Sequence, residues 1–278
     1  MSLGVVIKGP EGVVLAADSR ITLEARRGND PPVTMNFNNA TKLLAFSKPH
    51  SFVGAVTYGA AVMGGQRTAH SYVPEFELSL QGVEGPLPVK DHAKRLSDFF
   101  MSRWKETKSP DSGPGMSFVV GGYDPRAAYG SVFVFNVPNQ PDPQPRNAGE
   151  GEFGMTWGGQ REIATRLIHG FDPALAQALA EKLKLDEQQM EEIFKEVRRN
   201  LPFPIPYAAL PLQDCIDLAT FLIRSTILFQ NVAVGVRGVG GPIDVAVITR
   251  TDGLRFVQRK VIRGEPSTPR RRYDVCDD

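Results

Sequence analysis

The chain has 278 residues, of which 41% are hydrophobic and 23% charged. This composition can form a hydrophobic core and excludes a largely disordered chain. With 32 basic and 31 acidic residues the formal net charge is only +1, so we expect neither nucleic acid nor an anionic membrane as a partner. Cys215 and Cys276 lie far apart, and no secretion signal or long apolar run is present, which favours a cytoplasmic protein.

The first sixty residues are predicted to form strands. Val, Ile and Leu dominate two short runs on either side of the turn Gly9-Pro10-Glu11-Gly12, a pattern typical of a β-hairpin. The polar stretch 24–39 contains two adjacent prolines and is expected to be an exposed loop or an extended hairpin tip. The strands are expected at residues 5–8, 13–17, 42–46 and 51–57.

Helices and strands then alternate in blocks. Small residues in 59–71 indicate a helix, and stretch 138–152 is expected to be a loop because it is rich in Pro and Asn. The remaining helices are expected at residues 89–105, 160–170, 175–201 and 212–230. The remaining strands are expected at residues 116–122, 130–137, 153–157, 232–236, 243–249 and 254–262.

This block order predicts an α+β fold with antiparallel sheets rather than a parallel crossover fold. Two stacked antiparallel sheets with helices on both sides would account for this order of strands and helices. The tail contains Arg270, Arg271 and Arg272 followed by aspartates, which favours a solvated, flexible C-terminal segment over a docking signal.

The segment Gly12-Val-Val-Leu-Ala-Ala-Asp-Ser-Arg20 resembles the signature of proteasome β-type subunits and their bacterial relatives. The resemblance implies a four-layer αββα sandwich of the N-terminal nucleophile (Ntn) hydrolase type. It covers residues 1–264 as a single domain with a helical insertion at about 172–212, and leaves 265–278 as the tail.

The resemblance also implies a nucleophile, because counting back from Asp18 without a gap places Ser2 at the family's catalytic N-terminal position. Removal of Met1 would expose an α-amino group on the same residue. That amine, with an ordinary pKa near 8, can accept the hydroxyl proton directly or through one water.

Two charged residues are expected to support Ser2. The opening hairpin returns Asp18 alongside Leu3, where its carboxylate can anchor an ammonium group. Lys42 resembles the family's catalytic lysine, whose charge lowers the pKa of the nucleophile's hydroxyl. Without the resemblance, Lys42 would be interpreted as an ordinary surface lysine at the start of a strand.

Main-chain groups complete the expected site. Thr57-Tyr-Gly-Ala-Ala61 looks like the family's strand-to-helix turn, in which the Gly59 N–H would stabilise the oxyanion from a helix N-terminus. By the same resemblance, Thr22 and Ala61 would hold an extended peptide substrate as an added strand.

The sequence departs from the family at three places. The turn Trp157-Gly158-Gly159-Gln160 lacks the usual supporting serine, and the stretch 236–241 lacks an aspartate and a serine. Serine also replaces the usual threonine at position 2. Elsewhere the four histidines show no metal-ligand spacing, and no nucleophile elbow is present.

We therefore expect a peptidase or amidohydrolase of the threonine peptidase type, with serine as nucleophile and no metal or cofactor. Two alternatives stay open: a non-catalytic structural subunit, which the departures favour, and a small-molecule acylase on the same fold. The expected partners are a peptide or amide substrate and further copies of the chain in a ring or stacked assembly. Whether an ATPase partner exists does not follow from the sequence.

Overall fold

The structure is a computed structural model that describes residues 2–25, 28, 30–109, 115–172, 174–235 and 237–264. It contains helices and antiparallel sheets, as the α+β prediction requires. Sheet 1 has the strand order β10-β1-β2-β11-β12 and sheet 2 the order β5-β6-β7-β8-β9. Sheet 1 is formed by β1 (Leu3–Lys8), β2 (Val13–Asp18), β10 (Gly154–Gly159), β11 (Ile243–Thr249) and β12 (Gly253–Gln258). Sheet 2 is formed by β5 (Leu43–Ala45), β6 (Val53–Gly59), β7 (Met116–Gly122), β8 (Ser131–Val137) and β9 (Gln140–Arg146).

The two sheets pack against each other through a shared apolar cluster. Alternate residues of β2 point into it, since side chains along a strand alternate between the two faces. Val13, Leu15 and Ala17 of sheet 1 are at most 1% exposed and meet Val56 and Val119 of sheet 2. Strands β1 and β2 therefore have one face between the sheets and the other under helices, which explains why both are entirely buried.

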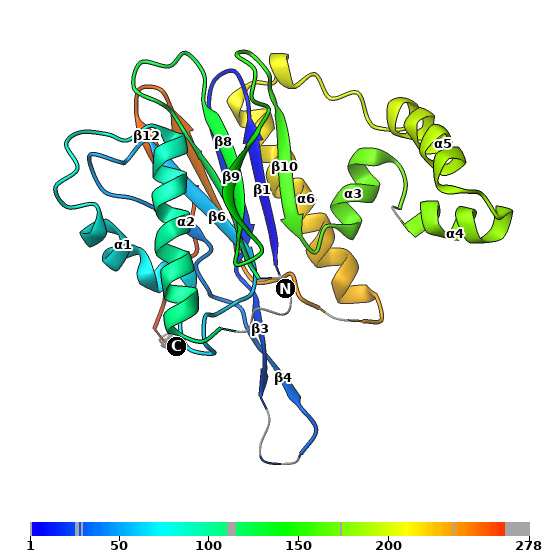
Figure 1. Ribbon diagram of the computed structural model, residues 1–278, viewed down its shortest axis with the longest axis horizontal. Helices are drawn as coiled ribbons and strands as arrows, with labels where there is room; N and C mark the ends of the chain where they lie inside the picture. Colours follow the sequence, from blue (N-terminus) through cyan, green and yellow to red (C-terminus); the bar gives the residue numbers. More distant parts are fainter. Residues whose placement is uncertain are drawn as a thin grey trace, which may run out of the picture.

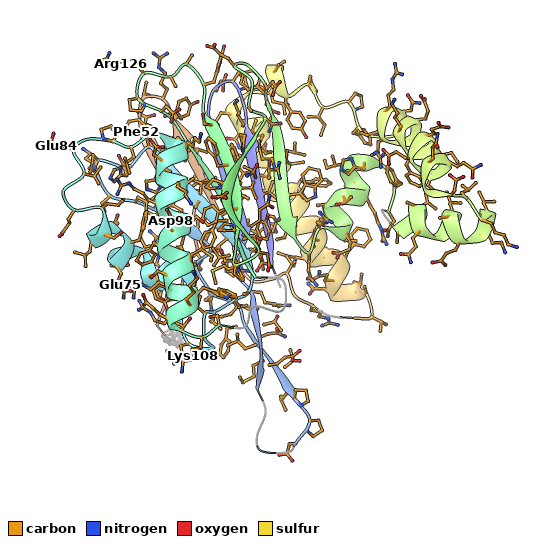
Figure 2. The ribbon with its side chains drawn as sticks, in the orientation of Figure 1. Phe52, Glu75, Glu84, Asp98, Lys108 and Arg126 are labelled. Atoms are coloured by element: carbon orange, nitrogen blue, oxygen red, sulfur yellow. The ribbon has the colours of Figure 1, made fainter. Side chains whose placement is uncertain are left out.

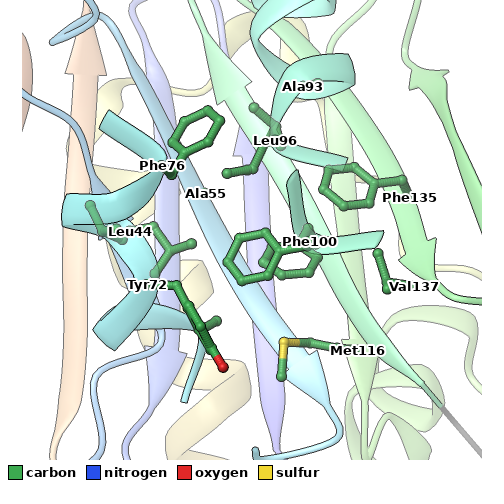
Figure 3. Close-up of a cluster of buried hydrophobic side chains, with 14 of the residues drawn as sticks. Leu44, Ala55, Tyr72, Phe76, Ala93, Leu96, Phe100, Met116, Phe135 and Val137 are labelled. Carbon is green, nitrogen blue, oxygen red and sulfur yellow. The ribbon is translucent and has the colours of Figure 1, made fainter. Parts of the chain in front are cut away.

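The outer face of sheet 2 is covered by α1 (Val73–Ser79) and α2 (Val89–Glu106). The apolar face of α2 follows the helical period that the sequence predicts. Figure 3 shows Leu96 and Phe100 of α2 in one buried cluster with Phe135 of β8. The opposite side of α2 carries charged side chains such as Asp98, labelled in Figure 2.

The outer face of sheet 1 is covered by α3 (Glu162–His169) and α6 (Leu212–Val232). Among the described residues, α6 is the single helix that is both long enough and apolar enough to cross a membrane. Length and composition do not distinguish such a helix from one that packs in a domain, and α6 contacts β1, β2, β11 and α3. Its other side exposes large apolar residues: Phe221, Leu228, Phe229 and Val232.

The segment expected as a helical insertion contains α4 (Ala174–Leu183) and α5 (Glu187–Asn200). Both helices stand away from the sheets, beside α3 (Figure 1). The prediction of one continuous helix over 175–201 is wrong. Lys184 has a φ of 54°, and Asp186 begins α5 with a capping box to Gln189, so the chain stops and restarts.

Within the stretch 24–39, the described residues 24–25 and 33–37 belong to the paired strands of a hairpin, which was one of the two expectations. Strands β3 (Ile21–Ala25) and β4 (Val33–Phe37) pair only with each other in the described part of the chain and project from the sheets (Figure 1). We call them the β3–β4 ribbon. The prediction for the tail at 265–278 lies outside the described residues.

The expected loop after β8 is instead the edge strand β9, whose sequence is Gln-Pro-Asp-Pro-Gln-Pro-Arg. Proline lacks the N–H that a ladder needs, but the prolines occupy alternate positions, 141, 143 and 145. Gln144 and Arg146 lie opposite Val134 and Val132 and carry the ladder to β8. Pro145 lies opposite Phe133, between these two ladder positions, and none of the three prolines has an N–H to offer to another strand.

Two other predictions are wrong. Residues 59–71 form no helix over most of their length, because Gly64 and Gly65 have φ values of 53° and 71°, and only a short 3-10 turn follows at Ala69–Tyr72. Residues 232–235 form no strand, since α6 extends through Val232; Val236 lies outside the described residues.

A buried histidine makes stability depend on pH. His92 of α2 is fully buried against Phe46 and Phe76, and neither ring nitrogen has a hydrogen-bond partner within the described chain. Burial, with a smaller contribution from His50, lowers the pKa of His92 to about 3.

Between the unfolded pKa of about 6.5 and the folded pKa of about 3, the unfolded state binds a proton that the folded state does not. Stability contributed by His92 is therefore full above pH 6.5 and is lost as the pH falls. At pH 5 the expected loss is about 2 kcal/mol. Urea unfolding at pH 7 and pH 5 measures it, and His92→Phe should remove this part of the pH dependence; an unchanged dependence would contradict the prediction.

Candidate functional site

Asp18, at the end of β2, has four hydrogen-bond donors around its buried carboxylate. Oδ1 accepts from the Leu3 N–H at 3.0 Å and from Lys42 Nζ at 2.7 Å. Oδ2 accepts from the Arg20 N–H at 3.1 Å and from the Gly240 N–H at 2.9 Å. The antiparallel register of β1 and β2 places Asp18 beside the start of the chain, as predicted. With its oxygens occupied in this way, Asp18 is suited to anchor the Lys42 ammonium.

Lys42 is 4% exposed and reaches Asp18 from the chain just before β5. Its ammonium also donates to the Arg20 carbonyl. An ammonium has three donors, so one remains after these two contacts. Burial lowers the pKa of Lys42, the charge of Asp18 opposes that shift, and the charges of Lys260 and Arg20 add to it.

Ser2 and Lys42 line the same small pocket, together with Thr57 and Ala61. The pocket has about 20 Å³ of space, enough for about one water molecule. Ser2 is 3% exposed, and its carbonyl accepts the Gln160 N–H at 2.7 Å, which ties it to the end of β10. The Thr57 hydroxyl is buried without a hydrogen-bond partner in the described chain.

The structure brings only some of the expected residues to this pocket. Ser2, Lys42 and Ala61 line it, with Asp18 behind Lys42. Gly59 lies at the end of β6, between two residues that line the pocket. The helix expected directly after Gly59 is absent, so no helix dipole acts on its N–H. Thr22 points its hydroxyl to Asn36 across the β3–β4 ribbon, and its neighbour Ile21 lines the pocket instead.

Gly59 needs its conformational freedom at this position. Its φ is +93°, and a Cβ would lie 2.5 Å from the Gly115 carbonyl oxygen. The next N–H, that of Ala60, donates to the same oxygen at 2.6 Å. The backbone is therefore folded tightly beside the pocket, which leaves no room for another residue type.

Tyr58 was not recognised in the sequence as part of the site. It lines the pocket, and its ring lies where a side chain at Gly158 would project: a Cβ there would be 2.2 Å from Cζ. Its phenol shares a hydrogen bond with Ser117, which accepts from Asn136 Nδ2 at 2.8 Å. A hydroxyl from sheet 2 thus lies beside the turn that lacks the family's serine. The adjacent glycines at 158 and 159 were the available signal, since glycine in a strand often marks a close approach.

A second buried ion pair lies behind Asp18 and was also missed. Lys260 pairs with Asp244 of β11, and both side chains are at most 6% exposed. Lys260 also donates to the Ser19 hydroxyl at 3.2 Å. Its charge is close enough to lower the pKa of Lys42. Sequence gives no signal for this pair, because the two residues face each other only through the β11–β12 pairing.

The contact between Tyr58 and Gly158 leads to a stability prediction. Gly158→Ala should cost about 1–3 kcal/mol of unfolding free energy, because the new methyl group overlaps the ring. In the double variant with Tyr58→Ala the cost of the glycine change should fall by about 0.5–3 kcal/mol. A double-mutant cycle in urea measures this coupling, with Gly264→Ala, which meets no atoms, as control; additive costs would contradict the contact.

Comparison with models of known protein families and with curated protein sequences gave no match for this chain. The functional assignment therefore depends on the residues and their geometry.

Proposed function

We propose that the chain is a proteasome β-like Ntn hydrolase that cleaves peptide or other amide bonds with Ser2 after removal of Met1. The observation that carries the proposal is the pocket shared by Ser2 and Lys42, with Lys42 held by a buried ion pair to Asp18 at 2.7 Å. The stacking of helices, two antiparallel sheets and helices supports the four-layer sandwich of that fold family.

In the proposed reaction the Ser2 hydroxyl attacks the substrate carbonyl and its proton passes to the Ser2 α-amino group, directly or through a water. The remaining donor of Lys42 stabilises the developing alkoxide, and the Gly59 N–H stabilises the oxyanion. The amine then protonates the leaving nitrogen as the amide bond breaks. Water hydrolyses the resulting ester and regenerates Ser2.

Asp18 and Lys260 have opposite effects on the pKa of Lys42. Asp18 favours the ammonium form, whereas burial and the charge of Lys260 disfavour it and lower the pKa of Lys42. Such a balance is typical of a lysine tuned for catalysis rather than one exposed to solvent. Lys260 is a positioning residue in this scheme, since it contacts Ser19 and Asp244 and does not line the pocket.

Covalent capture tests the proposal. Protein expressed from its native start codon is treated with a peptidyl fluorophosphonate, which reacts with activated serine hydroxyls. We expect the intact mass to show loss of Met1 and one adduct per chain, which fragmentation maps to Ser2. Retention of Met1, or an adduct on another serine, would rule out the mechanism.

A non-catalytic structural subunit is the second candidate, and the size of the pocket favours it. About 20 Å³ holds about one water, so a substrate side chain would need Ile21, Tyr58 or Met116 to move. Protein that has lost Met1 but shows neither an adduct nor hydrolysis of a peptide library would support this candidate.

We also propose assembly with further copies of the chain, in either case. The outward side of α6 exposes Phe221, Leu228 and Phe229 by 52–59% and Val232 by 84%. Adjacent exposed apolar side chains on one helix are typical of a protein interface. Sedimentation velocity over a range of concentrations should detect the assembly, and Phe229→Lys should weaken it.

A further inference from the structure

Another cavity in the described chain shares no lining residue with the Ser2 pocket and lies between the edges of the sheets and the α3–α5 region. Its volume is about 680 Å³, within the usual range for small-molecule sites. The walls come from β9 and β10, which are edge strands of the two sheets, and from the α3, α4 and α5 region. The Ser2 mechanism uses none of its lining residues.

The charged side chains that line this cavity are all arginines. Arg146, Arg161 and Arg198 line it, and no acidic side chain is among the described lining residues. Arg198 is bound by Glu191 at 2.6 Å, but Arg146 and Arg161 have no ion pair within the described part of the chain. Both are near enough to Tyr58 to lower its pKa against the larger, raising effect of burial. Two arginines in one cavity thus have guanidinium donors free for a ligand.

The rest of the wall is aromatic. Trp157 and His169 have ring centroids 5.5 Å apart, and Phe171 and Phe194 follow with centroids 5.8 Å apart. The Trp157 Nε1–H donates to the Thr165 hydroxyl at 3.2 Å, which fixes the indole ring in the wall. A planar ligand could stack on such rings while its charged group meets the arginines.

We propose that this cavity binds a small aromatic anion, a phosphate ester or a carboxylate attached to a ring. The guanidinium groups of Arg146 and Arg161 pair with the anionic group, because planar forks match phosphate and carboxylate oxygens. The aromatic wall formed by Trp157, His169 and Phe171 takes the ring. The proposal is independent of the Ser2 chemistry.

Calorimetric titration of the whole chain at low salt tests it with four probes. Phenyl phosphate and benzoate carry a ring and a charge, inorganic phosphate lacks the ring, and benzyl alcohol lacks the charge. We expect phenyl phosphate or benzoate to bind at least about tenfold more tightly than both inorganic phosphate and benzyl alcohol. Whichever of the two aromatic anions binds more tightly identifies the preferred anionic group. Equal binding of benzyl alcohol, or no binding by either aromatic anion, would overturn the proposal.

Variants locate the binding. Arg161→Gln should weaken binding about tenfold or more, and Ala176→Trp should block it by filling the cavity from α4. Arg95→Gln, an exposed arginine on α2, is the matched control and should bind as the unmodified chain does. Thermal unfolding checks that each variant is folded. Unchanged affinity in both cavity variants would overturn the site, whereas Ser2→Ala should leave the affinity unaltered.

Discussion

Replacement of Ser2 by alanine is expected to reduce peptide hydrolysis by roughly 10³-fold or more while leaving the unfolding free energy nearly unchanged. The loss follows because the proposed reaction has no other nucleophile, and removing a nucleophile from an acyl-transfer site costs orders of magnitude in kcat. Stability should persist because the Ser2 carbonyl contact to Gln160 is made by the backbone. Ser2→Thr keeps the hydroxyl and should keep measurable turnover.

Ser97 provides a matched control for that experiment. It is a fully buried serine of α2, and its hydroxyl donates to the Pro141 carbonyl at 2.5 Å. Ser97→Ala should therefore cost about 1 kcal/mol of stability and leave turnover intact. Steady-state kinetics and urea unfolding on both variants separate the two roles. Full activity in Ser2→Ala would eliminate the Ser2 mechanism.

Lys42→Met is expected to lower the unfolding free energy by about 3–5 kcal/mol and to remove activity. The substitution keeps most of the apolar stem but leaves the Asp18 carboxylate buried without its cation, which is the costly way to break a buried ion pair. Chemical denaturation monitored by circular dichroism at pH 7 measures the change.

Lys94→Met supplies the comparison for Lys42. Lys94 also contacts an aspartate at 2.9 Å, but its side chain is 48% exposed. Exposed pairs contribute little, so this change should cost less than about 1 kcal/mol. Similar losses of unfolding free energy in Lys42→Met and Lys94→Met would show that burial does not make the Asp18–Lys42 ion pair more important for stability than an exposed pair.

The elements that the sequence predicts well are those determined by nearby residues. The opening hairpin follows from a four-residue turn between β-rich runs, and its register alone places Asp18 beside Leu3. Helices α2 and α6 follow from apolar residues at helical spacing over 18 and 21 residues. In each case the local preference and the tertiary packing agree.

The features that sequence analysis missed depend on contacts between distant segments. Tyr58 meets Gly158 because the two sheets pack face to face, and Asp244 meets Lys260 through the pairing of the last two strands. Likewise, the small residues after Gly59 suit a helix by composition, yet two glycines with positive φ turn the chain elsewhere. Propensity carries no information on such contacts.

The alternating prolines of β9 limit how copies of the chain can associate. A foreign strand docking on a sheet border needs a row of amide hydrogens to bind, and residues 141, 143 and 145 offer none. Sheet 2 therefore cannot grow sideways into a continuous fibre at this border. Association of copies by strand addition must use another border, and a mutant that restored one of those amides, such as Pro143→Thr, would open a new route to aggregation.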